Sequence, residues 1–169
     1  ADGHVTVHAD GDPAHGLDLY QLAMDLQAQG VGLPLLLRFS DILRARISQL
    51  AEVFRSAIGE FGYEGSYTTV YPIKVNQQRH VVQELVQYGR PYHLGIEAGS
   101  KPELLVALAL QENPEALVLC NGYKDRAYIE TALLAKKLGR QVVIIMDRIG
   151  ELETIIQASR DLDIRPLIG

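Results

Sequence analysis

The sequence predicts an α/β protein built around a largely parallel sheet. From Tyr67 onward, short apolar runs alternate with stretches of helical periodicity, which is the order that parallel β/α units produce. The apolar runs are nearly continuous, so strands buried on both faces are expected. Polar side chains follow four successive runs, at Lys74, Glu97, Asn121 and Asp147.

Two architectures can carry this pattern. One is a doubly wound open sheet, which would be complete at 169 residues. The other is the first half of a (β/α)₈ barrel, which as a whole typically needs ~250 residues. Right-handed crossovers would bring the four polar residues to one rim in either case, and the residue pattern alone leaves both architectures open.

The first 39 residues differ from the rest and are predicted to form a lead-in that contains strands. Residues 4–8 alternate as a short strand, and residues 10–16 are rich in turn formers. Residues 17–29 have the pattern of a short amphipathic helix closed by Gly30, and residues 33–39 have that of a strand.

Residues 40–169 are predicted to begin with the longest helix and to continue as β/α units. Ser40 is expected to be the helix N-cap, and Gly62 to end that helix. Pro72 cannot donate to a ladder, so regular pairing should end near it. Ser100 and Glu103 match a capping box. Further strands are expected at residues 67–73, 92–96, 117–120, 142–146 and 166–168, and further helices at 77–88, 104–111, 125–138 and 151–162.

Composition limits the classes of partner and compartment. The net charge of −5 argues against a nucleic-acid partner, because no basic face is available to release counterions. The longest apolar run is too short to span a bilayer, so no membrane partner is expected. Cys120 is the only cysteine, which excludes an internal disulfide and fits a reducing, cytoplasmic compartment and a buried, inert thiol. His4 and His8 lack the companions that a metal site needs.

Lys74 is the residue with the clearest chemical potential. It follows an apolar strand, at the end where α/β folds place their ligands. A partly desolvated amine loses its proton more easily and can act as a nucleophile that forms a Schiff base. The competing interpretation is an ordinary surface lysine at a strand end.

Four runs of sequence together closely resemble the biosynthetic arginine decarboxylases. They are Leu33-Pro-Leu-Leu-Leu-Arg-Phe-Ser-Asp-Ile-Leu43, Val70-Tyr-Pro-Ile-Lys-Val-Asn-Gln77, Gly95-Ile-Glu-Ala-Gly-Ser-Lys-Pro-Glu-Leu104 and Cys120-Asn-Gly-Tyr-Lys-Asp125. That family consists of pyridoxal-phosphate enzymes of the alanine-racemase-like barrel group. The resemblance extends over essentially the whole chain. Residues 147–152 depart from the family's commoner Glu-Lys-x-Ser-Glu-Leu, which puts only local capping in doubt.

The resemblance implies a fold and a cofactor site. Residues 40–169 would be the N-terminal half of a pyridoxal-phosphate-binding (β/α)₈ TIM-type barrel, with the chain ending in barrel strand five and residues 1–39 supplying strands of a β domain. Lys74 would be the catalytic residue and would carry pyridoxal 5'-phosphate as a Schiff base. Glu97 would lie near the lysine and cofactor. The alternatives for Glu97 are pairing with Lys101 or capping a turn.

The resemblance also implies an activity. The enzyme would be a carboxy-lyase that converts L-arginine to agmatine and carbon dioxide in polyamine and spermidine biosynthesis. Magnesium and a homo-oligomer are expected through the family alone, with no ligand residues assigned to the metal. The phosphate-binding loop and the partner of the ring nitrogen lie later in the family's sequences, so residues 1–169 alone are expected to be inactive.

Three alternative functions remain open at this point. One is a related ornithine or diaminopimelate decarboxylase. Another is a non-catalytic pyridoxal-phosphate-binding barrel protein of cofactor homeostasis. The third is a doubly wound binding domain in which Lys74 is an ordinary strand-end charge.

Overall fold

The computed structural model describes residues 3–8 and 12–169, and begins with a small hairpin and a helix. Strand β1 (Thr6–Val7) pairs antiparallel with β2 (Leu17–Asp18), and α1 (Leu19–Ala28) follows directly. The Asp18 carboxylate accepts a hydrogen bond from the Gln21 amide at 3.0 Å, so it caps α1. The helix therefore starts two residues later than the sequence predicts. Residues 9–11, in the expected turn-rich loop, lie outside the described residues.

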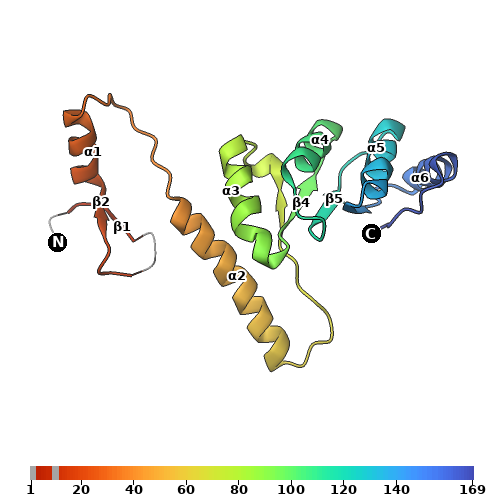
Figure 1. Cartoon of the computed structure of the whole chain (residues 1–169), viewed down its shortest axis with the longest axis horizontal. Coiled ribbons are helices and arrows are strands. Elements are labelled where there is room, and N and C mark those ends of the chain that lie inside the picture. The colour runs from red at the N-terminus through yellow and green to blue at the C-terminus, as the bar shows by residue number, and fades with distance from the viewer. Residues whose placement is uncertain (1–2, 9–11) are drawn as a thin grey trace.

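An extended segment, residues 31–39, joins this lead-in to the rest of the chain (Figure 1). The strand predicted at residues 33–39 is not formed, so that prediction is wrong. A strand needs a neighbour that supplies its ladder hydrogen bonds. No such neighbour lies beside this segment in the part of the chain that the structure describes.

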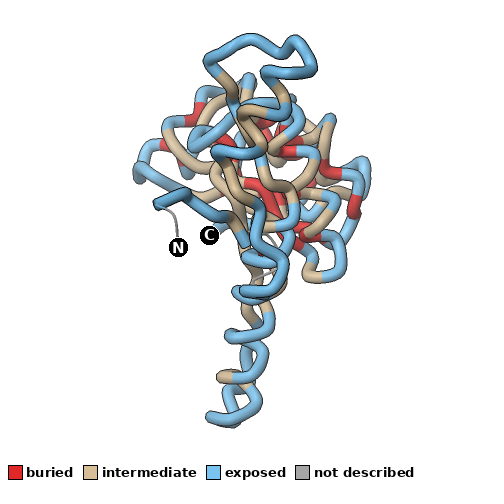
Figure 2. The backbone as a smooth tube through the Cα atoms, turned by 90° about the vertical axis from the view of Figure 1, so that its left-hand side faces the viewer, coloured by how far each residue is buried: buried red, intermediate tan, exposed pale blue. Residues whose placement is uncertain are grey.

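Helix α2 (Ser40–Glu60) is the longest helix, but its start differs from the expected one. Phe39 occupies the N-cap position and Ser40 is the first helical residue. The prediction that Ser40 caps the helix is wrong, because its hydroxyl instead donates to Glu84 Oε1 at 2.7 Å and thereby links α2 to the next helix. Only Ile47 of α2 is buried. Its far half projects from the molecule as a mostly exposed rod (Figure 2).

Four parallel strands form the sheet, and a helix follows each of them. The strand order is β3-β4-β5-β6, the same as in the sequence. The strands are β3 (Val70–Pro72), β4 (Gly95–Ala98), β5 (Leu117–Cys120) and β6 (Gln141–Ile144); the helices are α3 (Arg79–Gly89), α4 (Lys101–Leu110), α5 (Arg126–Lys137) and α6 (Ile149–Leu162). Short 3₁₀ turns lie at Ile73–Val75 and Arg90–Tyr92. Ile168 forms an isolated parallel bridge to Ile144, beside the last strand of the sheet.

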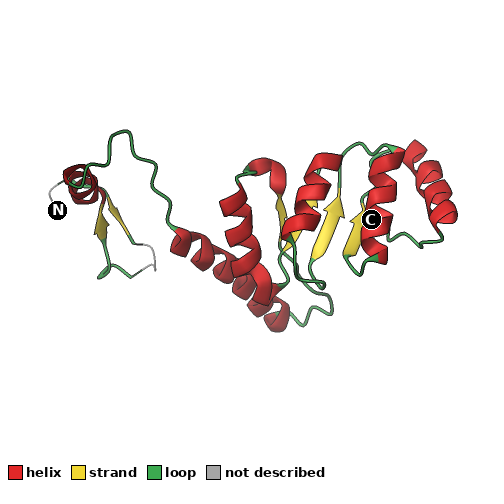
Figure 3. Ribbon diagram, turned by 45° about the horizontal axis from the view of Figure 1, so that its top comes forward, coloured by secondary structure: helices red, strands yellow, loops and turns green. Residues whose placement is uncertain are grey.

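The strand order decides between the two architectures. A doubly wound sheet reverses its order at a switch point and carries helices on both faces. Here the order never reverses, and α3 to α6 all lie on one side of the strands (Figure 3). The structure therefore contains consecutive β/α units of a barrel, as the family resemblance implies.

The core lies between the sheet and these helices. Ile96, Val118 and Val142 occupy one register row on the helix-facing side and are at most 2% exposed. The opposite row contains Glu97 and Leu119, which are only partly buried. The expectation of strands buried on both faces is thus wrong for the described residues, because helices cover only the outer face.

The strands are shorter than the predicted runs, for identifiable backbone reasons. Strand β3 ends at Pro72 and continues as a 3₁₀ turn, as expected for a residue without an amide hydrogen. Strand β4 begins only at Gly95, because residues 90–92 form a second 3₁₀ turn and His93 adopts a left-handed conformation with φ of 51°. Local backbone geometry therefore ends these strands earlier than the apolar runs in the sequence do.

Replacing Ile96 by alanine should lower the free energy of unfolding by about 2 to 5 kcal/mol, because a fully buried side chain is lost from the centre of the core. Ile149→Ala is the matched control, since Ile149 is 86% exposed. Urea unfolding of both variants measures the difference. Equal losses in the two variants would contradict this placement of the core.

Candidate functional site

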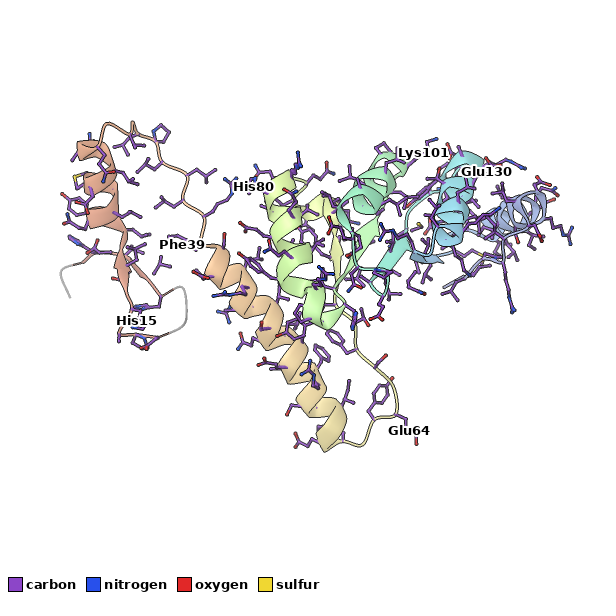
Figure 4. All side chains as sticks on the ribbon, in the orientation of Figure 1. His15, Phe39, Glu64, His80, Lys101 and Glu130 are labelled. Atoms are coloured by element: carbon purple, nitrogen blue, oxygen red, sulfur yellow. The ribbon has the colours of Figure 1, made fainter. Side chains whose placement is uncertain are left out.

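The carboxyl ends of the four strands meet at one rim, and the loops that follow them carry the candidate site. His80 and Lys101, in the first turns of α3 and α4, lie at the upper end of the molecule in Figure 4. Glu64, in the segment that leads into β3, lies at the lower end. The side chains predicted to be functional follow the upper ends of the strands.

Lys74 and Glu97 lie together at this rim. Lys74 is in the 3₁₀ turn after β3, and Glu97 pairs in register with Pro72 on the inner row of the sheet. The Lys74 Nζ lies 3.6 Å from Glu97 Oε1, which is an ion pair rather than a hydrogen bond. The structure thus brings together the two residues that the sequence analysis singled out.

Lys74 is more exposed than a desolvated nucleophile would be. Its side chain is 63% exposed, whereas that of Glu97 is 16% exposed. Two hollows of about 410 Å³ each lie away from Lys74: one is between α3 and α4 beside Arg90, and the other is beside Tyr92. Four strands do not enclose an interior, so the inner face around Lys74 is open.

Lys101 does not pair with Glu97, so this alternative for Glu97 is wrong. Lys101 Nζ instead donates to Asp125 Oδ2 at 2.9 Å, across the loops that follow β4 and β5. The Asp125 Oδ1 accepts the Tyr128 amide at 2.7 Å and so caps α5. Lys101 and the Tyr128 amide both lower the pKa of the Asp125 carboxyl below its ordinary value.

The predicted capping box at the start of α4 is confirmed, except that the Glu103 side chain bonds one residue earlier than expected. Ser100 Oγ accepts the Glu103 amide at 3.4 Å, and Glu103 Oε2 accepts the Gly99 amide, one residue before the cap. Gln77 donates to the other Glu103 oxygen at 3.5 Å, which connects the loop that carries Lys74 to the loop after β4. Ser100 and Glu103 are therefore structural at this rim.

Tyr128 anchors the ends of two strands from below the rim. It is 1% exposed, and its hydroxyl donates to the Ala98 carbonyl at 2.6 Å, next to Glu97. Burial raises the pKa of the Tyr128 hydroxyl, so it stays a donor at neutral pH. Cys120 is fully buried, as predicted, and desolvation raises the pKa of its thiol to about 12. The thiol is therefore not available as a nucleophile.

The loops after β4 and β5 touch through two glycines. Gly122 has a φ of +69°, and a Cβ there would lie 2.6 Å from the Gly99 carbonyl oxygen. Both the left-handed conformation and the close approach require glycine at position 122. The two loops consequently pack against each other with backbone alone.

Glu151 is the buried group that sequence reasoning did not single out. It is 4% exposed at the start of α6, and its carboxylate accepts the amides of Lys124 and Asp147, each at 3.0 Å. Burial raises the pKa of the Glu151 carboxyl, but these hydrogen bonds and the Lys124 ammonium outweigh burial, so the pKa lies below its ordinary value. An acidic residue in the first turn of a helix was the available signal. The N-cap residue of α6, Arg148, makes no side-chain cap hydrogen bond, and Glu151 instead accepts the amide of Asp147, one residue before Arg148.

Among residues 3–8 and 12–169, no group of three or more His, Cys, Asp or Glu side chains could hold a metal ion. His4 Nδ1 instead contacts Asp18 at 2.6 Å. No helix in the described chain is long and apolar enough to cross a bilayer.

Known proteins resemble this chain in sequence and in structure. Residues 44–166 match the family described as pyridoxal-dependent decarboxylase, pyridoxal binding domain. The biosynthetic arginine decarboxylases of Gloeobacter violaceus and Thermosynechococcus vestitus are 54% and 52% identical, over 99% and 100% of the chain. The chain spans about a quarter of their length, 26% in each case.

Two solved structures are similar. The biosynthetic arginine decarboxylase SpeA from Campylobacter jejuni superposes with a TM-score of 0.86 at 34% identity, over 100% of this chain and 28% of the other. The diaminopimelate decarboxylase of M. jannaschi reaches a TM-score of 0.67 over 90% of this chain and 32% of the other. At 21% identity, this second likeness concerns the fold alone.

Asp125→Asn should remove a stabilising charge without removing the helix cap, because the amide oxygen can still accept the Tyr128 amide. The folded-state pKa of Asp125 is depressed, so its contribution is present above the unfolded pKa and is lost as pH falls through the folded pKa. Wild type should therefore exceed the variant in unfolding free energy at neutral pH, and the difference should vanish in acid. Urea unfolding between pH 7 and pH 2 measures this difference. A difference in unfolding free energy that stays constant from pH 7 to pH 2 would contradict this expectation.

Proposed function

Since this chain belongs to the pyridoxal-dependent decarboxylases, we propose that it supplies the covalent cofactor anchor of an arginine decarboxylase. In this proposal, Lys74 Nζ holds pyridoxal 5'-phosphate as a Schiff base. The observation that carries the proposal is the Lys74–Glu97 pair at the carboxyl-end rim, with both side chains on the inner side of the strands. The identity to biosynthetic arginine decarboxylases along the whole chain supports L-arginine as the substrate.

The residues at the rim fit this cofactor in their chemistry. A primary amine is the group that forms a Schiff base with an aldehyde, and Lys74 is accessible enough to meet one. Its position after β3 places the amine at the edge of the inner face, where a ring could lie along the strand ends. The half-buried Glu97 carboxylate holds the amine at this edge and offers a proton acceptor beside it.

The positions of these residues suggest separate roles for the cofactor and for the protein. Pyridoxal phosphate, when bound, supplies the electron sink that accepts the electrons left at Cα when carbon dioxide leaves. Lys74 fixes where that group lies along the rim. Glu97 lies within β4, whereas Asn121 and Asp147 lie in the loops after β5 and β6. In this proposal the three side chains shape the polar surface that the substrate meets.

The remaining elements of the proposal rest on the relatives. We infer that agmatine is the product, within polyamine biosynthesis, and that the protein acts in the cytoplasm as a homo-oligomer. Magnesium stays a prediction carried by family resemblance. Residues 1–169 supply the anchor but enclose no interior, so they are expected to be inactive alone. The relatives in sequence and the similar solved structure are decarboxylases, which favours an enzyme over a non-catalytic carrier.

Borohydride reduction in the presence of pyridoxal phosphate should fix the cofactor permanently on Lys74, because reduction converts the Schiff base to a stable secondary amine. Peptide mass spectrometry of the intact protein that contains this chain locates the modified lysine. Lys74→Ala should abolish both the modification and agmatine formation. Lys101→Ala is the control, since Lys101 is at the same rim but bound to Asp125. Modification of Lys101 or another lysine instead would overturn the assignment.

Glu97→Gln should weaken cofactor retention while leaving the fold intact, because the amide keeps the size of the side chain and loses its charge beside Lys74. Glu112→Gln, far from the rim in the groove between α3 and α4, is the control. Equilibrium dialysis of pyridoxal phosphate from each variant measures retention. Wild-type retention in Glu97→Gln would assign Glu97 a structural role only.

A further inference from the structure

The most deeply buried charged pair of the described chain lies outside the Lys74 site. Lys124 and Glu151 have side chains that are 0% and 4% exposed, and Lys124 Nζ lies 3.1 Å from Glu151 Oε2. The ammonium also donates to the Gly122 carbonyl at 2.5 Å. The carboxylate accepts two backbone amides as well, so both groups have several partners.

These partners come from two different loops. Lys124 and Gly122 belong to the loop between β5 and α5, and Asp147 belongs to the loop between β6 and α6. One carboxylate therefore joins the loops that follow two neighbouring strands. Outside the buried pair, the Arg148 guanidinium lies over the Tyr123 ring at 5.1 Å and joins the same loops a second time.

The connection continues from these loops toward the Lys74 site. Gly122 packs against Gly99, and the Asn121 amide donates to the Ala98 carbonyl at 2.9 Å. Ala98 is the neighbour of Glu97 in β4. A contiguous set of contacts thus runs from Glu151 through the loop after β5 to the strand that carries the partner of Lys74.

Stability alone does not explain a pair of this kind. Burying two charges costs several kcal/mol of desolvation per ion, and replacing such a pair by apolar residues of similar size is often neutral or stabilising. An ion pair of this kind fixes the relative positions of the groups around it. The Glu151 carboxylate has three donors, the Lys124 amide, the Asp147 amide and Lys124 Nζ, and only one arrangement satisfies all of them. Asn121 and Asp147, the strand-end residues beside these donors, are held by that arrangement.

We infer that Lys124 and Glu151 form a positioning pair that sets Asn121 and Asp147 at the rim in register with Lys74 and Glu97. The pair touches neither cofactor nor substrate and acts through the two loops. This inference rests on the proposed function, because the rim it orders is the one proposed to hold pyridoxal phosphate. Loss of the pair loosens the rim without removing any group that contacts the ligand.

The test is the double variant Lys124→Met, Glu151→Gln in the intact protein after removal of its cofactor. Pyridoxal phosphate is titrated back and followed by absorbance, and thermal unfolding is recorded without cofactor. The variant should stay folded at the titration temperature but melt somewhat lower than wild type, because a Gln amide offers one oxygen for the two backbone amides. It should bind pyridoxal phosphate roughly tenfold to a hundredfold more weakly, which is the loss typical of removing an outer partner that orients a binding group, as at metal sites. Arg126→Met, Asp161→Asn is the matched control, because it removes an exposed ion pair between α5 and α6, the helices that follow the two loops. It should bind the cofactor like wild type.

If the double variant does not fold, a second variant tests the positioning role of the pair. Glu151→Asp keeps the charge that neutralises Lys124 but shortens the reach to the two amides. Weaker cofactor binding at an unchanged melting temperature supports the positioning role. Wild-type affinity in the folded variants overturns it. Failure of the wild-type protein to take up pyridoxal phosphate would instead overturn the proposed function, and the positioning role with it.

Discussion

Parallel hydrogen bonding between strands that follow one another in sequence is the constraint on which this structure depends. Each strand pairs with the one before it, so each connection must cross the same face of the sheet in the same sense. The helices consequently gather on one side, and every strand ends at the same rim. Polar residues that lie more than twenty positions apart in sequence thereby become neighbours. The topology of the sheet therefore brings the polar groups of the rim to one edge.

Much of the β/α part was predictable because its signals are local. The strand over residues 117–120 and the cap at Ser100 depend on apolar runs and on hydrogen bonds within four residues. Tertiary context decided the exceptions. Residues 33–39 have strand composition, yet no strand of the described chain pairs with them, and Ser40 bonds across to Glu84 instead of capping its own helix. The residues next to each segment in the sequence do not show whether a distant part of the chain will pair with it.

The site was predictable in the same uneven way. Lys74 stood out as a lone basic residue after an apolar run, whereas Glu97 was implied by the family resemblance, and the structure places the two 3.6 Å apart. The burial of Lys124 and Glu151 could not be predicted, because both residue types are usually exposed and their pairing spans 27 positions. Whether a charge lies inside or outside depends on how the loops pack, and that is a property of the assembled rim.

The contact between Gly122 and Gly99 restricts how this rim can change over time. A methyl group at position 122 would collide with a carbonyl oxygen that cannot move without disturbing β4. The next residue, Tyr123, is 64% exposed, and its ring lies under the Arg148 guanidinium. Adjacent positions in one loop therefore face different constraints: a lack of space at position 122 and a single surface contact at position 123. Among related decarboxylases, we expect substitutions at residues near Gly122 in this loop but not at Gly122 itself.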